Sequence, residues 1–291
     1  RHPDTPKSVF SLMWSTLQSG EAFGGYVKNR SASGCYYWVF AVAAPVGDGY
    51  LSVRLKPSTP LFEKMRGLYS EILNAERDEG LLPEAGAARI VEAVRANGFR
   101  SYNAFMGYAL ACEMTARCEA LGVPVDQSIA QFQHMGEHLI RMTEDVKHVR
   151  DIFRGIATVP VNLSILGSRL SERRAPIQEI AINYKMQSDE ILQTLEAMDR
   201  SMTDLLAKAY RGRMGHCASC FYEEAIGAYE RDEPNKQTRG HSAELKVLQS
   251  ALSKFRTDAQ QGCAEIASQV AKFTEVIKEL SPYNASGADE I

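Results

Sequence analysis

Three long stretches of sevenfold apolar spacing constrain this chain most, because a helix that carries such a seam buries it against another helix. The first stretch alternates spacings of three and four through Phe132, Met135, Leu139, Met142, Val146, Val149, Phe153 and Ile156. The second runs through Ile191, Leu195, Met198, Met202 and Leu205, and the third through Leu245, Leu252, Ala259, Ile266, Phe273 and Leu280. We therefore expect a long helical hairpin or coiled-coil bundle at residues 125–280. Periodicity alone does not distinguish a signal-transmitting hairpin from a generic helical bundle.

Residues 1–57 have a different pattern. A short amphipathic helix is predicted first, because Val9, Phe10, Met13, Trp14 and Leu17 fall at helical spacing. Residues 19–20, Ser-Gly, end that helix. Strand-like runs rich in Tyr, Trp, Val and Phe follow at residues 25–30, 35–46 and 50–55, separated by glycine-containing turns. We expect a helix packed on a three-stranded antiparallel sheet. Because three strands are few for a closed domain, we also expect further strands upstream, in a longer chain.

The expected fold class is therefore mainly α, with a partial α/β unit at residues 1–57 and the helical hairpin at 125–280. Linker helices are expected between them, within residues 58–124, at 61–76, 86–98 and 100–120, with a break at 82–86 and a stop at Gly122. Residues 281–291 are polar, so we expect a flexible tail.

Composition excludes several classes of protein. The net charge is −3 and the isoelectric point about 6.1, which argues against a nucleic-acid partner. No apolar run reaches the length of about 18 residues that a membrane-spanning helix needs. The six cysteines are sparse and no secretion signal is visible, so a cytoplasmic location is expected. Without a glycine-rich phosphate loop or a catalytic acid–base pair, we expect no enzyme.

The opening residues 1–7 read RHPDTPK, residues 27–30 read VKNR, and residues 37–39 and 49–54 read YWV and GYLSVR. Together with residues 20–21, Gly-Glu, this pattern resembles the PAS domain of bacterial aerotaxis receptors. The resemblance covers residues 1–57 and implies that they form the C-terminal half of a PAS domain. A phenylalanine, Phe23, stands where that family has a tryptophan.

The resemblance also implies a cofactor, because PAS domains of this family bind FAD non-covalently and sense redox state. Carried over residue by residue, it implies that Arg1, His2 and Asp4 hold the flavin, with Trp14 beside them and Asn29 on the facing strand. The side chains suit these roles, since a guanidinium pairs with pyrophosphate, an indole stacks on a ring, and a carboxamide both donates and accepts. From the residues alone, Asp4 can equally be a helix N-cap and Trp14 a core residue.

A second resemblance lies at the turn of the expected hairpin. Residues 155–157 (GIA), 162–166 (NLSIL), Arg174 and residues 180–181 are similar to the hairpin tip of methyl-accepting chemotaxis proteins. In that family the tip binds a kinase and its coupling protein, so the resemblance implies such partners or another signalling protein. Prolines at 160 and 176 depart from the family's pattern. Because exposed seams need a partner helix, we also expect a homodimer.

His216, Cys217 and Cys220 stand close together, and His241 lies downstream. Four such side chains can hold zinc, and a C-x-x-C pair can carry thiol redox chemistry. Both cysteines can instead be small buried residues near the start of a helix. We expect the last of these, and so no metal site.

These observations together predict a cytoplasmic bacterial signal-transduction sensor. FAD in the PAS half would respond to redox state, oxygen or light, and the coiled-coil region would pass the change to a partner. The alternative is an adaptor or structural protein whose PAS remnant binds no flavin. The sequence does not identify the stimulus, the downstream partner or the role of Cys217 and Cys220.

Overall fold

The computed structural model describes residues 2–156, 158–169, 174–231 and 241–285, without the side chains of residues 174, 241 and 279–285. Arg1, the side chain of His241 and the end of the expected tail at 286–291 therefore lie outside the described residues. The fold is mainly α-helical with one small three-stranded antiparallel sheet, as expected from the sequence.

The chain forms two compact units. The first unit comprises residues 1–133 and 209–263, and the second comprises residues 134–208 and 264–291. Three of the long helices contribute residues to both units. The expected domain boundaries at residues 57, 124 and 280 stay predictions.

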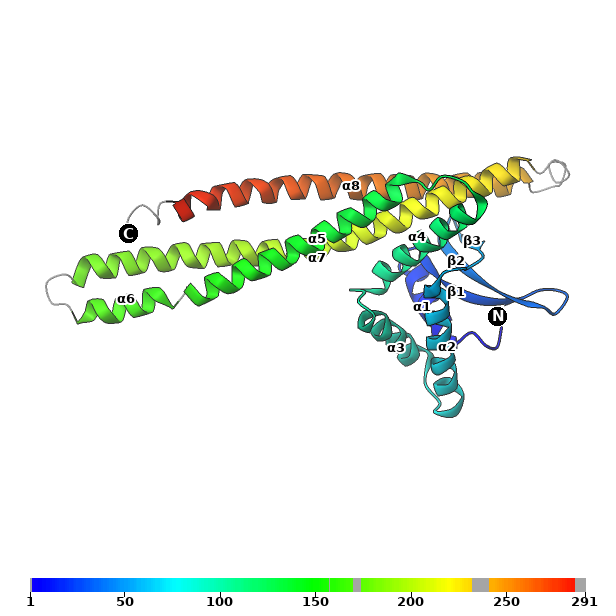
Figure 1. Ribbon diagram of the computed structural model, residues 1–291, viewed down its shortest axis with the longest axis horizontal. Helices are drawn as coiled ribbons and strands as arrows, with labels where there is room; N and C mark the ends of the chain where they lie inside the picture. The colour runs from blue at the N-terminus through cyan, green and yellow to red at the C-terminus, as the bar shows by residue number, and fades with distance from the viewer. Residues whose placement is uncertain (1, 157, 170–173, 232–240, 286–291) are drawn as a thin grey trace. The chain divides into compact units, whose positions relative to one another are not determined.

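The first unit opens with the expected helix and sheet. Helix α1 (Lys7–Gln18) is followed by strands β1 (Phe23–Arg30), β2 (Tyr36–Val46) and β3 (Gly49–Leu55), paired antiparallel in that order (Figure 1). The hairpin turns contain Gly34 and Gly47 at φ angles of 89° and 56°, which a residue without a Cβ adopts readily. The register sets Tyr26 opposite Phe40, so both side chains lie on the same, buried face of the sheet.

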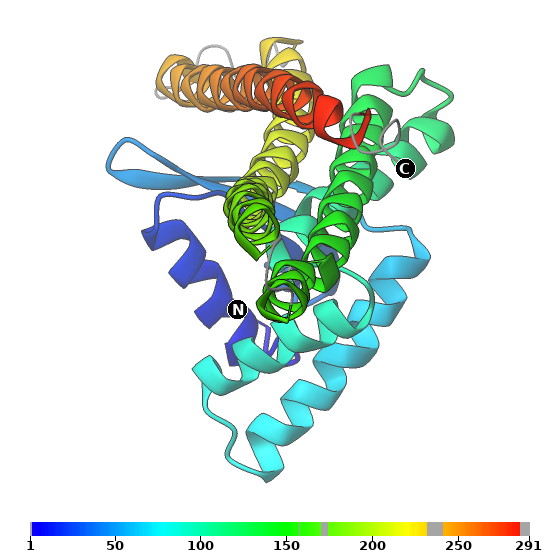
Figure 2. The same cartoon turned by 90° about the vertical axis from the view of Figure 1, so that its left-hand side faces the viewer.

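Three shorter helices complete the N-terminal part of this unit: α2 (Pro60–Asp78), α3 (Pro83–Ala96) and α4 (Tyr102–Leu121). Helices α1 and α2 both pack against α3, while α4 packs against β1 and α3 (Figure 2). The expected break at 82–86 is shorter than predicted, because Pro83 occupies the first turn of α3, where proline is tolerated well. Gly122 ends α4 in the left-handed conformation, as the sequence indicated.

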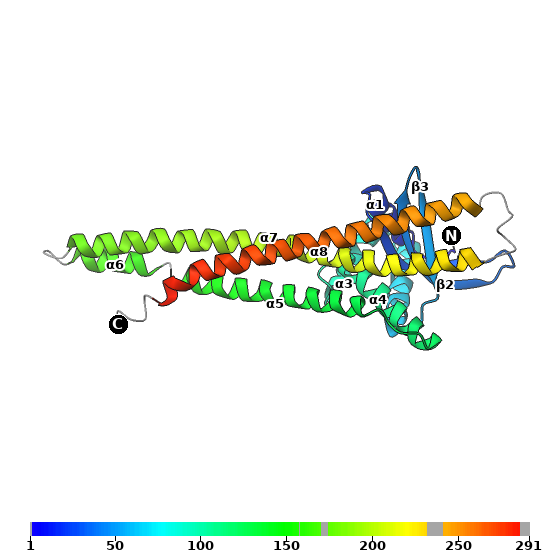
Figure 3. The same cartoon turned by 90° about the horizontal axis from the view of Figure 1, so that it is seen from above.

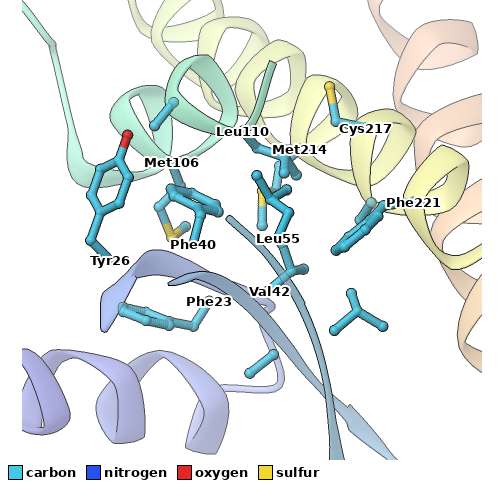
Figure 4. Packing of buried hydrophobic residues seen from close by; sticks show 14 of the residues in the cluster. Phe23, Tyr26, Phe40, Val42, Leu55, Met106, Leu110, Met214, Cys217 and Phe221 are labelled. Atoms are coloured by element: carbon cyan, nitrogen blue, oxygen red, sulfur yellow. The ribbon is translucent and has the colours of Figure 1, made fainter. Parts of the chain in front are cut away.

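The core of the first unit contains a part of the chain that the sequence did not place there. Beside side chains from the sheet and α4, it includes Met214, Cys217 and Phe221 from the distal part of α7 (Arg174–Arg231) (Figure 4). Close approach depends on Gly24 of β1, where an added Cβ would come within 2.9 Å of the Met214 methyl group. The sheet is therefore buried by a helix segment nearly two hundred residues away in sequence.

The second unit consists of segments of α5 (Gln127–Ile156), α7 and α8 (His241–Ala285), together with α6 (Val159–Ser168). Helices α5 and α8 run beside α7 in this unit (Figure 3). An Arg150–Asp199 ion pair at 2.9 Å joins α5 to α7, and a Lys208–Glu265 pair at 2.8 Å joins α7 to α8. Among the seam residues whose side chains the structure describes, Val149 is exposed, at 38%, and the side chain of Leu280 lies outside the described residues. The buried seam residues of this unit are Leu139, Val146, Leu195, Met198, Met202, Leu205, Ile266 and Phe273.

Helix α6 and the start of α7, on either side of the hairpin turn, expose large apolar side chains, and we call these two segments the tip. Pro160 falls within the first turn of α6 and Pro176 near the start of α7, so each proline marks the beginning of a helix. None of the described helices is both long and apolar enough to cross a membrane. The apolar side chains of this tip that are at least half exposed are Val161, Ile165, Leu166, Ile180, Ile182 and Met186.

Candidate functional site

Two of the residues predicted to hold flavin, His2 and Asp4, lie against β1. The Asp4 carboxylate accepts a hydrogen bond from Nζ of Lys28 at 2.8 Å, and the Lys28 backbone N–H donates to Oγ1 of Thr5 at 3.2 Å. The Lys28 ammonium lies 4.0 Å from the centroid of the Tyr36 ring. The centroids of the His2 and Tyr36 rings are 5.3 Å apart. His2, Asp4, Lys28 and Tyr36 therefore form one group, which we call the His2–Asp4 cluster.

Asp4 lies between two cations. The hydrogen bond from Lys28 lowers the pKa of Asp4 below its ordinary value, although burial acts in the opposite direction. Arg77 of α2 approaches the same carboxylate at 3.8 Å and donates to the carbonyl oxygen of Pro3 at 3.3 Å. The cluster thus presents an ionised carboxylate beside an ammonium and a guanidinium, a set that can bind phosphate or ribose oxygens.

Asn29 follows Lys28 on β1, so its side chain points to the opposite face of the sheet. Its amide nitrogen Nδ2 is buried and has no hydrogen-bond partner among the described residues. Buried polar groups almost always have a partner, so this N–H is suited to donate to a bound group. The unpartnered amide therefore fits the role at a flavin edge that the resemblance implies for Asn29.

Trp14 does not join His2 and Asp4. Its side chain is 44% exposed and meets the Tyr50 ring edge-on, with the two ring centroids 5.2 Å apart. Tyr50 pairs with Pro45, at the opposite end of the sheet from Asn29. His2, Asp4 and Asn29 thus lie at one end of the sheet and Trp14 at the other, and the Asn29 side chain lies on the opposite face of β1 from that of Lys28, which binds Asp4.

The alternative roles considered for Asp4 and Trp14 are not those that the structure shows. The N-cap of α1 is Pro6, and Asp4 does not cap the helix. The carboxylate of Glu76 from α2 does so instead, accepting hydrogen bonds at 2.8 Å from the backbone N–H groups of Lys7 and Ser8. Sequence reasoning missed Glu76 because it lies far from α1 along the chain.

A second carboxylate, fully buried, joins the sheet to α2. Glu113 of α4 accepts hydrogen bonds from the Tyr26 hydroxyl at 2.9 Å, the Thr59 hydroxyl at 2.6 Å and the Ser58 backbone N–H at 2.7 Å. Burial first and Glu113 second raise the pKa of Tyr26, so the phenol keeps its proton and donates. Since Ser58 and Thr59 directly precede α2, Glu113 connects β1 to the beginning of that helix.

A cavity of about 1130 Å³ lies among α2, α3 and α4 of the first unit. A volume of this size accommodates a cofactor-sized molecule. The wall of this cavity includes none of the four described flavin candidates, His2, Asp4, Trp14 and Asn29. Apolar side chains dominate its wall, among them Met65, Leu68, Val94, Phe99 and Phe105.

A third group of polar side chains converges elsewhere in the first unit. His216 and Cys220 lie four residues apart on α7, and Asp126 lies directly before α5. The Asp126 Oδ2 atom is 3.0 Å from Nε2 of His216 and 3.4 Å from Sγ of Cys220. Burial first, and then Asp126, raise the pKa of the Cys220 thiol to about 12.

The two cysteines of the C-x-x-C segment do not face one site. Cys217 is fully buried in the core of the first unit, where desolvation raises the pKa of its thiol to about 12 (Figure 4). Cys220 is only partly buried and faces Asp126. We expected two buried cysteines near the start of a helix. Cys217 is buried as expected, but both cysteines lie well inside the long helix α7.

Comparison with known proteins finds a similarity to a bacterial receptor. The aerotaxis receptor of Escherichia coli (strain K12) is 43% identical over 82 residues, which are 26% of this chain and 16% of that receptor. The chain thus spans about a sixth of the length of the relative it matches. No protein-family model matches the chain. The chain is therefore similar to an aerotaxis receptor over about a quarter of its own length.

Proposed function

We propose that this partial homologue of an aerotaxis receptor is a cytoplasmic sensor that binds FAD in its PAS-like segment and reports redox state, oxygen or light through its helices. The observation that carries the proposal is the 43% identity to the receptor. It is supported by the RHPDTPK and VKNR segments, which the fold places side by side through the Asp4–Lys28 ion pair. The unpartnered Nδ2 of Asn29 supplies a hydrogen-bond donor on the other face of β1.

His2, the Asp4–Lys28 pair and Asn29 are the described residues that would hold the cofactor. Bound FAD supplies reversible electron transfer, which is chemistry of the flavin itself. The chain's own residues orient and bind it: Asp4 fixes the N-terminal segment on β1, and Asn29 donates a hydrogen bond. A change in that hydrogen bond would act on β1, the strand to which both Lys28 and Tyr26 belong.

From β1, two polar connections lead to α2, and we propose that they carry the signal. Glu113 connects Tyr26 to the beginning of α2, and Arg77 connects Asp4 to its end. A helix held at both ends by the sheet shifts or rotates when the sheet does, and such packed elements have a few discrete arrangements. Small changes at β1 would in this way bias the population of helix arrangements.

The absorption spectrum of the purified chain, with FAD added, tests flavin binding. We expect a flavin spectrum that remains after gel filtration and is lost in Asn29→Ala and Asp4→Ala variants. Asp48→Ala is the matched control, because Asp48 lies in the exposed β2–β3 turn. A folded, colourless wild-type chain would reject the flavin proposal and favour the adaptor alternative.

The tip of the hairpin supports a proposal about partners. Helix α6 contains no charged residue, and its neighbour along the turn, the start of α7, exposes Ile180, Ile182 and Met186. A second copy of this chain offers the same exposed apolar side chains, as an isologous interface requires. We propose a homodimer through this tip, and a chemotaxis kinase, its coupling protein or another signalling protein as the downstream partner.

A further inference from the structure

We propose that Asp126, His216 and Cys220 form a binding site for a divalent transition-metal ion, with zinc as the best match. The three side chains come from two places in the sequence and meet at the start of α5 and one face of α7. The proposal is independent of flavin binding, because it involves none of the residues assigned to the flavin.

The distances between the ligand atoms are those of a tetrahedral zinc centre. With zinc bonds of about 2.0 Å to nitrogen and oxygen and about 2.3 Å to sulfur, neighbouring ligand atoms lie about 3.3 Å apart, or about 3.5 Å where one is sulfur. His216 Nε2 and Asp126 Oδ2 are 3.0 Å apart, and Cys220 Sγ lies 3.4 Å from Oδ2 and 3.7 Å from Nε2. Each separation is within about 0.3 Å of the tetrahedral value.

All three ligand atoms lie within 4.8 Å of one another, and their arrangement differs from that of a catalytic triad. In a triad, the two nitrogens of histidine face different partners, so that one side accepts a proton while the other is held by the acid. Here the same Nε2 atom of His216 faces both Asp126 and Cys220. A single imidazole nitrogen cannot relay a proton between them, but one metal ion can bind all three atoms.

Neighbouring groups hold two of the ligands in place. The other oxygen of Asp126, Oδ1, accepts a hydrogen bond at 2.8 Å from the backbone N–H of Ser128 in α5. The His216 ring stacks on Phe132, with centroids 5.4 Å apart and planes inclined by 29°. Outer interactions of this kind orient metal ligands and are a regular part of metal sites.

The composition of the group favours zinc over harder cations. Thiolate and imidazole ligands select zinc and similar transition metals, whereas magnesium and calcium need oxygen ligands. Three protein ligands leave a fourth position for water, and the Asp126 side chain is 41% exposed, so solvent reaches the site. As the metal–sulfur bond forms, the Cys220 thiol releases its proton to solvent, and the bound ion would join the beginning of α5 to α7.

Metal titration of the purified full chain tests the proposal, under reducing conditions and after removal of metals with a chelator. We expect one equivalent of Zn²⁺ to bind. Co²⁺ in its place should give a thiolate-to-cobalt charge-transfer band in the near ultraviolet. Cys220→Ser should abolish that band, and Cys220→Ser and His216→Ala should each weaken Zn²⁺ binding by more than about 100-fold, beyond the usual effect of losing an outer partner.

Matched controls are Cys118→Ser and His134→Ala, which remove the same side-chain types at positions outside the site. They should bind both metals as the wild type does. Circular dichroism of each variant shows whether it is folded. Asp126→Asn provides a further ligand variant, because the substitution nearly preserves the shape of the side chain. A wild-type chain that binds neither Zn²⁺ nor Co²⁺ would overturn the proposal, as would a cobalt band that persists in folded Cys220→Ser.

Discussion

At the scale of single residues, acidic side chains stabilise the ends of helices in the first unit from outside those helices. Glu113 reaches the beginning of α2, and Glu76 reaches the beginning of α1. The first backbone N–H groups of a helix have no partner within it, so a carboxylate there both accepts hydrogen bonds and interacts well with the helix dipole. These contacts hold together elements that are distant in sequence.

Replacing Glu113 by alanine should strongly destabilise the first unit. The change leaves the buried Tyr26 hydroxyl and the donors of Ser58 and Thr59 without their acceptor, and each hydrogen bond to a charged group contributes about 1.5–3 kcal/mol. We expect a loss of about 3 kcal/mol or more in the free energy of unfolding, measured by urea denaturation. Glu119→Ala, on the exposed face of the same helix, should change it by less than about 0.5 kcal/mol. Equal effects of the two variants would contradict this role of Glu113.

The Cys220 thiol should react slowly with alkylating reagents in the metal-free chain. A thiol whose pKa is raised to about 12 is almost fully protonated at neutral pH, and its reactive thiolate appears only as the pH approaches that value. Exposed Cys35 should therefore be alkylated first and buried Cys217 last, as followed by peptide mass spectrometry in the presence of a chelator. Asp126→Asn should accelerate alkylation of Cys220, because it removes a negative charge that raises this pKa. An unchanged rate in that variant would show that burial alone controls the thiol.

Residue roles could be predicted from the sequence only where the contacts are local or a family pattern exists. The spacing of His216 and Cys220 was visible, but Asp126 lies ninety residues away, and nothing nearby marks it as a third ligand. Glu113 was missed for a related reason: a glutamate within a helix is normally solvent-exposed, and only tertiary packing buries this one. The pairing of Asp4 with Lys28 likewise depends on strand position rather than on sequence proximity.

At the scale of elements, the close approach of α1 and α3 depends on a glycine. A Cβ added at Gly86 would lie 1.9 Å from the Ser8 hydroxyl and 2.8 Å from the Ser8 Cβ. Both distances are well inside van der Waals contact, so the helices would have to separate. By contrast, a Cβ at Gly67 on the exposed side of α2 would meet no atom of the described residues within 4 Å.

The substitutions Gly86→Ala and Gly67→Ala should therefore have opposite effects. Overpacking at the α1–α3 contact should lower the free energy of unfolding by about 1–3 kcal/mol. Alanine at Gly67 should raise it by up to about 1 kcal/mol, because alanine is the better helix former. Thermal denaturation followed by circular dichroism measures the stability of both variants. A neutral or stabilising effect of Gly86→Ala would show that α1 and α3 pack more loosely than these distances indicate.

Helices and strands were predictable because periodic patterns record which face is buried. The strands of the sheet and the sevenfold seams were found within a few residues of their observed positions. The continuation of α7 to Arg231 was not predicted, because its apolar residues beyond Leu205 no longer follow a single seam. There the helix packs on the sheet and on other helices, and several of its faces are buried.

At the scale of the whole molecule, the chain combines a PAS-like segment with long helices whose distal part, in α7, completes the core around the sheet. The helices that belong to both units provide continuity of the backbone between them. A sensor of the proposed kind needs such an arrangement, since the segment that binds the cofactor must share elements with the segment that contacts the partner.

At this scale we also predict that the chain assembles as a homodimer through the tip. Burying a leucine-sized side chain contributes about 1.5–3 kcal/mol, so several exposed apolar residues at the tip can sustain a dimer. We expect the wild-type chain to sediment as a dimer in analytical ultracentrifugation and the double variant Leu166→Glu, Ile180→Glu to sediment as a monomer, because paired glutamates at a two-fold interface repel. Leu82→Glu, at another exposed leucine, in the first unit, is the matched control and should remain dimeric. A monomeric wild type would remove the basis for a tip-mediated homodimer, and a dimeric double variant would place the interface elsewhere on the chain.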